Sequence, residues 1–201
     1  MVQCLGELQA LKPAISQKVS YLEGKGDKSM STTTKTWQEE VYELLRKHDV
    51  EIFGYVPDAG HKYLINTSIA DPAVHAVSLT TEEEGIGLCT GAHLGGKRAV
   101  LLMQSSGVGN TINLLSLVKL GHFPFLTLVT MRGNFGEGNP WQFPMGQATQ
   151  AVLEAMGVIC LPAWTEEDVL PVVEAALTMS FKSGNAVAVL LTQRLLGAKE
   201  F

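Results

Sequence analysis

The chain has 201 residues, 46% of them hydrophobic, which is enough for one buried core but too short for two domains of ordinary size. Its net charge is −5, its pI is near 5.5, and the sequence contains no basic stripe. These features argue against nucleic acid or an anionic membrane surface as a partner. No apolar run approaches the roughly 18 residues of a membrane span, no signal-peptide core opens the chain, and the three cysteines fit reduced thiols, so we expect a cytoplasmic protein.

Residues 1–35 differ in composition from the rest of the chain. Glycines at positions 24 and 26 and the polar run SMSTTTK (29–35) are typical of a linker. We therefore expect an N-terminal extension over 1–35, without a packed structure of its own, and a folded domain over 36–201.

From Thr36 onward, apolar strands alternate with helices. An amphipathic helix begins near Trp37, and the strand VEIFG and the turn YVPDAGHK follow it. Further strands are expected at 74–79, 98–104, 125–131, 158–160 and 186–191, and further helices from 82 and over 111–120, 147–156 and 166–181. This alternation predicts an α/β fold of three layers, with a mostly parallel sheet covered by helices on both faces.

Four loops at the carboxyl ends of the expected strands hold most of the unusual residues, and ligands of open α/β sheets bind at that edge. The loops are YVPDAGHK, TTEEEG, QSSGVGN and RGNFGEGNPWQFPMG. The segment SSGVGN could bind a phosphate at a helix N-terminus, but it lacks the Lys-Ser/Thr pair of a P-loop and the third glycine of a dinucleotide fingerprint.

The stretch TTEEEGIGLCTGAHLGG (80–96) places three acids in the first turn of a helix, and Thr81 with Glu84 has the spacing of a capping box. Acids at a helix N-terminus complement the helix dipole, which is sufficient to explain Glu83 and Glu84. It does not explain the glycines that follow, because each costs about 1 kcal/mol against alanine inside a helix. We expect this helix to pack unusually close to a neighbour.

The run EEEGIGLCTGAHLGG, with VLLMQSSGVGN, PFLTLVTMRG and a loop ending PMGQAT, resembles the pyrimidine-binding domain of thiamine diphosphate-dependent decarboxylases. Within that family it is most similar to the small subunit of sulfopyruvate decarboxylases and to phosphonopyruvate decarboxylases. The resemblance covers about residues 36–195. The metal-binding GDG…N motif of the family's other half is absent from this sequence.

The resemblance implies that Glu82 is the catalytic glutamate, which shares a proton with ring nitrogen N1′ of the cofactor, and that Asp58 is a second catalytic acid. A short charge-assisted hydrogen bond from a carboxylate in an apolar crevice suits that role. Gly85 and Gly87 would then allow the aminopyrimidine and a partner's backbone to come close. Four polar residues at a strand end are expected to orient the pyrimidine or the substrate, or to be plain caps: Gln104, Ser105, Ser106 and Asn110.

Three further residues are candidates for contact with the substrate. Arg132 follows a buried strand, where it could bind an anionic substrate tail or lie on the surface. His61 and His93 are near the expected site. The aromatic residues of the glycine-rich loop at 132–146 suit either a lid or an interface.

Two functions follow from these expectations. In the first, the chain is a subunit of a thiamine diphosphate-dependent 2-keto acid decarboxylase acting on sulfopyruvate-like or phosphonopyruvate-like substrates. A separate diphosphate-binding (beta) subunit then completes the site and holds Mg²⁺, and this chain holds no metal. In the second, the same fold is a non-catalytic binding or regulatory module.

Overall fold

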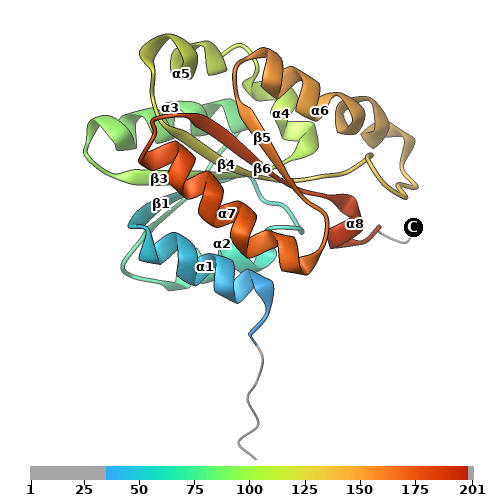
Figure 1. Ribbon diagram of the computed structural model, residues 1–201, viewed down its shortest axis with the longest axis horizontal. Coiled ribbons are helices and arrows are strands. Elements are labelled where there is room, and N and C mark those ends of the chain that lie inside the picture. The colour runs from blue at the N-terminus through green and yellow to red at the C-terminus, as the bar shows by residue number, and fades with distance from the viewer. Residues whose placement is uncertain (1–34, 199–201) are drawn as a thin grey trace, which may run out of the picture. The chain divides into compact units, whose positions relative to one another are not determined.

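The structure is a computed structural model that describes residues 35–198 (Figure 1). The predicted linker over 1–35 lies outside the described residues, apart from Lys35. Across 35–198, none of the helices combines the length and the hydropathy that a membrane crossing requires.

The described residues form a six-stranded sheet in the order β2-β1-β3-β4-β6-β5, and every neighbouring pair is parallel. The prediction of a mostly parallel sheet is therefore confirmed. The strands are β1 (Val50–Tyr55), β2 (His75–Ser78), β3 (Arg98–Gln104), β4 (Phe125–Thr130), β5 (Ile159–Ala163) and β6 (Ala186–Leu191). Strand β4 is buried along its whole length, as expected for an apolar central strand covered on both faces.

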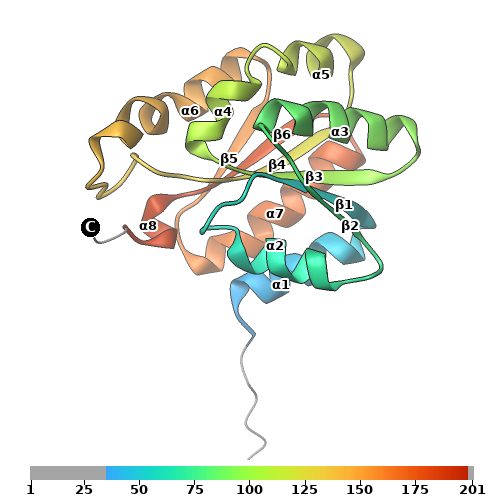
Figure 2. The ribbon, with the colours of Figure 1, turned by 180° about the vertical axis from the view of Figure 1, so that it is seen from behind.

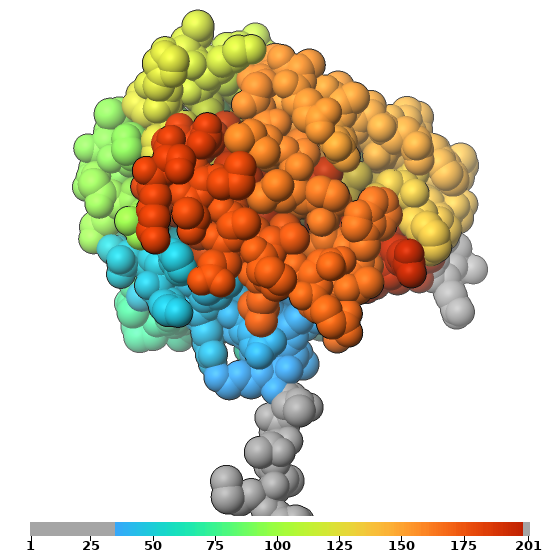
Figure 3. Space-filling view, in the orientation of Figure 1, coloured from blue at the N-terminus to red at the C-terminus, as the bar shows by residue number. Residues whose placement is uncertain are grey.

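Helices cover both faces of the sheet, which confirms the three-layer arrangement. One hydrophobic core lies under α1, α2 and α7, and a second core lies under α3, α4, α5 and α6. Figures 1 and 2 show these two groups on opposite sides of the sheet, and Figure 3 shows α7 (orange) beside α1 (blue). The helices are α1 (Trp37–Lys47), α2 (Lys62–Ala70), α3 (Glu82–Leu94), α4 (Ser105–Thr111), α5 (Leu115–Gly121), α6 (Phe143–Ala155), α7 (Glu166–Phe181) and α8 (Gln193–Leu196), with a 3-10 helix η1 (Pro140–Gln142).

Local sequence signals account for where α1 begins and ends. Thr36 and Glu39 form a capping box, which satisfies backbone donors at the helix start. Acidic side chains lie in its first turn and Arg46 and Lys47 in its last turn, as the helix dipole favours. The apolar stripe, including Val41 and Leu45, is buried against the sheet.

Helix α3 packs closely on β3, as its glycines predicted. A Cβ atom at Gly85 would overlap the side chain of Leu101 on β3. In contrast, nothing lies within 4 Å of the Cβ positions of Gly87 and Gly91, so these two glycines face open space. The prediction of a capping box between Thr81 and Glu84 is wrong, because the Thr81 side chain makes no capping hydrogen bond. Glu84 instead accepts a hydrogen bond from the N–H of Thr80, at 2.8 Å.

The structure departs from the sequence prediction mainly between β3 and β4 and after β1. The segment SSGVGN was expected to be a loop before one long helix, but it forms α4 directly at the end of β3, and α5 is a separate helix. Helix α2, the 3-10 helix η1 and the short α8 were not predicted. Helix α6 begins four residues before the predicted Gln147.

Candidate functional site

The candidate site lies at the carboxyl edge of the sheet, where β1 and β3 are neighbours. From β1 the chain passes through α2 to β2 on one side, and from β3 it passes through α4 and α5 to β4 on the other side. The two connections use opposite faces of the sheet, because α2 belongs to one core and α4 to the other. This arrangement is a topological switch point, the position at which parallel α/β sheets bind ligands.

Asp58, in the loop after β1, is the centre of one hydrogen-bonded group. Its carboxylate accepts from Gln104 Nε2 at 3.1 Å, from Thr130 Oγ1 at 2.6 Å and from the Gly60 N–H at 3.1 Å. Ser106 Oγ in turn donates to Gln104 Oε1 at 2.9 Å. The structure therefore connects the ends of β1, β3 and β4 through one partly buried carboxylate.

Glu82, the first residue of α3, belongs to a second group. It is 8% exposed, whereas the adjacent Glu83 and Glu84 are exposed. Asn110 Nδ2 of α4 donates to Glu82 Oε2 at 2.8 Å. No described residue donates to Oε1, which leaves that oxygen available to a ligand.

Gly107 of α4 provides the space that the Glu82 carboxylate occupies. A Cβ atom at position 107 would overlap Glu82 Oε1 and Cδ. The overlapping atoms are the end of the Glu82 side chain, so a larger residue at position 107 would have to displace the carboxylate. A glycine at this position thus leaves the space in which the Glu82 carboxylate lies.

Three predicted site residues, Ser105, His93 and His61, lie outside the two hydrogen-bonded groups, and their predicted roles stay predictions. Ser105 is fully buried, and its hydroxyl bonds the backbone of Arg132 (N at 3.0 Å and O at 3.3 Å). His93 lies in the last turn of α3 against Phe123, and eleven residues of helix place it about 16 Å from Glu82. It therefore lies toward the opposite end of α3.

His61 is also enclosed, with 1% of its surface exposed. Its Nε2 lies 3.0 Å from Leu128 O and 3.3 Å from Met103 O, and since both neighbours are acceptors, Nε2 carries the proton. Nδ1 has no partner among the described residues. Burial lowers the pKa of His61 and keeps the ring neutral. His61 thus ties the Asp58 loop to β3 and β4, and a contact of His61 with a substrate stays a prediction.

Arg132 forms a buried ion pair. Its Nε and Nη2 donate to the two oxygens of Glu137 at 2.6 and 2.8 Å. Gln193 Nε2 and the Asn139 N–H also donate to Glu137, each at 2.9 Å, and the Glu137 side chain is 0% exposed. The hydrogen bond from Arg132 lowers the pKa of Glu137 to about 2. The pair fixes the loop after β4, while a contact of Arg132 with a substrate stays a prediction.

Sequence reasoning missed three residues that shape the site. Thr130 belongs to an apolar strand pattern, although a polar residue at a strand's carboxyl end is a usable signal. Gly107 belongs to the segment SSGVGN, whose pattern suggests only a possible phosphate loop. Glu137 lies in a long glycine-rich loop, and nothing in its local pattern indicates that it is buried.

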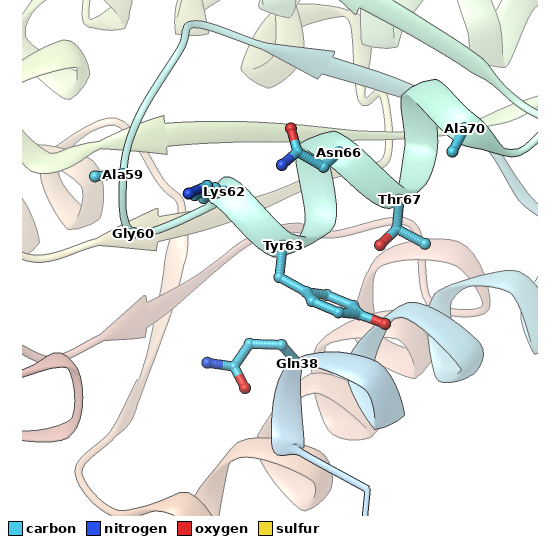
Figure 4. Close-up of a pocket in the computed structure, with 8 residues that line it drawn as sticks. All are labelled: Gln38, Ala59, Gly60, Lys62, Tyr63, Asn66, Thr67 and Ala70. Carbon is cyan, nitrogen blue, oxygen red and sulfur yellow. The ribbon is translucent and has the colours of Figure 1, made fainter.

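Two hollows flank the site. The first, of about 550 Å³, lies between α1 and α2, and Figure 4 shows Tyr63 of α2 pointing toward Gln38 of α1, with Lys62 and Asn66 further round α2. Its edge at Ala59 and Gly60 adjoins the Asp58 loop. The second, of about 760 Å³, lies between α4 and the segment 139–145.

No protein-family model matches the chain. It is 38% identical over 154 residues to the sulfopyruvate decarboxylase subunit alpha of Methanococcus maripaludis, a match that covers 76% of this chain and 92% of that protein. The sulfopyruvate decarboxylase subunit alpha of Methanothermobacter thermautotrophicus is 35% identical to this chain, and the match covers 93% of that protein. A sulfopyruvate decarboxylase of Methanosarcina acetivorans is 29% identical over 81% of this chain, but that match covers only 42% of its own length.

Two solved structures share the fold. A 2-oxoglutarate:ferredoxin oxidoreductase from Magnetococcus marinus superposes with a TM-score of 0.65 at 18% identity, covering 81% of this chain and 29% of that chain. A protein from Mycobacterium smegmatis assigned as a thiamin diphosphate-dependent enzyme also gives a TM-score of 0.65, at 16% identity, over 81% of this chain and 31% of that chain. The fold described here is thus one part of each of those longer chains.

Proposed function

Because this chain belongs to the family of sulfopyruvate decarboxylase alpha subunits, we propose that it is one subunit of a thiamine diphosphate-dependent 2-keto acid decarboxylase. The substrate class is a 2-keto acid with a sulfonate or phosphonate tail, as the names of these relatives and of two phosphonopyruvate decarboxylases at 36% identity suggest. The non-catalytic alternative has no comparable support.

The observation that carries the proposal is the Glu82 carboxylate. It is buried at a helix start, it is held by Asn110 through Oε2, and its Oε1 has no donor among the described residues. Such an oxygen fits a ring N–H, and therefore fits the N1′ atom of an aminopyrimidine. When bound, thiamine diphosphate supplies the carbon nucleophile that attacks the keto carbon. Glu82 would hold the shared proton at N1′, on which formation of that nucleophile depends.

Asp58 and the residues bonded to it would serve the substrate. The carboxylate of Asp58 is held by three donors, so its position is set before a ligand arrives. Gln104 and Ser106 are connected to it and extend the polar group toward α4. We assign Asp58 a proton-transfer role, with Gln104, Ser106 and Asn110 orienting the cofactor or the substrate.

The diphosphate and its Mg²⁺ would be held by a second subunit. The relatives of matching length carry the name subunit alpha, and the relative from Methanosarcina acetivorans has more than half of its length outside the match. A separate partner that corresponds to this additional part would complete the site from outside. Glu82 and Asp58 belong to the half that this chain contributes.

The test is reconstitution. The purified chain alone should turn over no sulfopyruvate and should bind thiamine diphosphate weakly, whereas the chain with its diphosphate-binding partner should do both. Turnover by the pure chain would remove the two-subunit proposal. An assembled pair that binds the cofactor but releases no CO₂ from any 2-keto acid would instead favour the non-catalytic alternative.

A further inference from the structure

A preformed aromatic surface lies beside the site. We call it the Trp141 surface, and it is the hollow lined by Ser106, Asn139, Pro140, Trp141, Pro144 and Met145. Trp141 is 82% exposed, and the neighbouring Phe143 is 42% exposed. None of the lining side chains is charged. An exposed tryptophan over an uncharged hollow is unusual for a surface that meets only water.

The segment that presents Trp141 is held in place from within. Asn139 Oδ1 accepts from the Trp141 N–H at 3.0 Å, which caps η1, and Glu137 accepts from the Asn139 N–H at 2.9 Å. Glu137 is itself fixed by Arg132 and Gln193. The exposure of Trp141 is therefore not the result of a loosely held loop. A surface already held in its binding geometry loses less entropy when a partner docks.

This surface is continuous with both hydrogen-bonded groups of the site. Ser106 lines the hollow and bonds Gln104, which bonds Asp58. Met145, on the opposite wall, faces Gly109 of α4, and the next residue of α4 is Asn110, the partner of Glu82. A body that covers Glu82 from outside therefore adjoins the Trp141 surface along α4.

We propose that the Trp141 surface is the docking site of the diphosphate-binding partner subunit, with Trp141 as its anchor. This inference rests on the proposed function. In the relative from Methanosarcina acetivorans the matching region is 42% of the length of that protein. The rest of that protein is large enough to correspond to a separate partner subunit of comparable size. The uncharged lining calls for an apolar segment of that partner, and exposed tryptophans in pockets are typical anchors of such interfaces.

The test measures binding of the partner subunit to the chain by titration calorimetry, for wild type and for Trp141→Ala. We expect the substitution to weaken binding by at least about 30-fold, the loss typical of an interface anchor. Trp164→Ala is the matched control, because Trp164 is also partly exposed (45%) but lies between β5 and α7, outside the surface. It should change the affinity by less than about 3-fold. All three isolated chains should melt within a few degrees of one another.

Trp141→Phe provides a second variant, which retains an aromatic side chain and should lose less affinity than Trp141→Ala. If wild type binds no partner, the proposed function fails and this inference fails with it. If wild type binds but Trp141→Ala binds equally well, only the docking site is refuted. If Trp141→Ala raises KM but leaves the affinity for the partner unchanged, the hollow binds the substrate. If Trp141→Ala only abolishes self-association, the hollow binds a second copy of this chain. Either result overturns the proposal.

Discussion

Glu82 is separated from its two acidic neighbours by burial. All three acids lie in the first turn of α3, where the helix dipole favours each of them. Only Glu82 turns inward, against Gly107 and Asn110, while Glu83 and Glu84 stay exposed. The dipole explains why acids occur here, and the contacts of Glu82 with Gly107 and Asn110 are the reason we propose it, and not its neighbours, as the cofactor ligand.

Gly107→Ala tests whether the position of that carboxylate matters. The added methyl group would occupy the space of the Glu82 carboxylate and push it away from Asn110. Because the overlap is with the end of a flexible side chain, the fold should survive with a loss of about 1–3 kcal/mol, and kcat of the assembled enzyme should fall at least about tenfold.

Gly109→Ala is the control on the same helix, because its methyl group would meet only the flexible end of Met145, at 3.4 Å. That variant should keep most of its activity. Normal turnover by Gly107→Ala would show that Glu82 need not lie where the structure places it.

The Arg132–Glu137 pair should make stability depend on pH. The folded-state pKa of Glu137 is about 2, below its usual value of 4.5, so the folded state gains stability above pH 4.5 and loses that gain as the pH falls toward 2. Glu137→Gln should be less stable than wild type at pH 7, by about 3–5 kcal/mol, because it leaves the Arg132 charge without its partner.

Urea unfolding of both proteins at pH 7 and at pH 3 measures this dependence. The stability gap between wild type and Glu137→Gln should narrow at pH 3, because there the Glu137 carboxyl is protonated in the unfolded chain but still ionised in the folded protein, which removes part of the wild type's advantage. A gap that stays the same at both pH values would mean that the pair contributes no pH-dependent stability.

At the scale of elements, sequence signals predicted those parts of the chain whose pattern is local. Strand β3, strand β6 and helix α7 have the predicted bounds. Helix α2 was missed because the segment after the Pro57 turn lacks the usual helix signals. It has no side-chain cap, no acidic residue in its first turn and no basic residue in its last turn. Helix α4 was missed because Ser, Gly and Asn favour turns, and here packing against α3 and α6 outweighs that preference.

The candidate site was predicted only in part, for a related reason. Asp58, Glu82, Gln104, Ser106 and Asn110 follow strand ends in the sequence, and parallel strands bring such ends to one edge. Burial of Ser105 and His61 depends on which way a side chain turns after the strand, and no local pattern gives that direction. Glu137, the partner of Arg132, also accepts from Gln193 of α8, more than fifty residues further along the chain, and no local pattern indicates that contact.

The exposed glycines of α3 lead to a prediction in which two effects have opposite signs. Gly87 and Gly91 have nothing within 4 Å of their Cβ positions, so Gly87→Ala and Gly91→Ala should each stabilise the isolated chain by about 0.5–1 kcal/mol. If a partner's backbone approaches this face, the same substitutions should weaken assembly.

Urea unfolding of the isolated chain and titration with the partner subunit measure the two effects separately. Greater stability with unchanged assembly would show that this face of α3 stays in water. In that case the glycines would have no role in the interface.

At the scale of the whole molecule, the residues of the proposed site lie at one edge of the sheet. The edge carries Glu82 at the start of α3, Asp58 after β1 and the Trp141 surface before α6. Each has a polar or apolar face that no described residue covers. This arrangement fits the proposal that the chain is inactive alone and acquires function on assembly with a second subunit.

The most direct test of this account is C2 proton–deuterium exchange of thiamine diphosphate bound to the enzyme assembled from Glu82→Gln and its partner. The amide keeps the shape of Glu82 but cannot share the N1′ proton, so exchange should slow by roughly 10²–10⁴ while the melting temperature changes little. Glu83→Gln and Glu84→Gln, at the same helix end, should exchange at the wild-type rate. Equal exchange in all three variants would contradict the account, because Glu82 would then act only as a complement to the helix dipole.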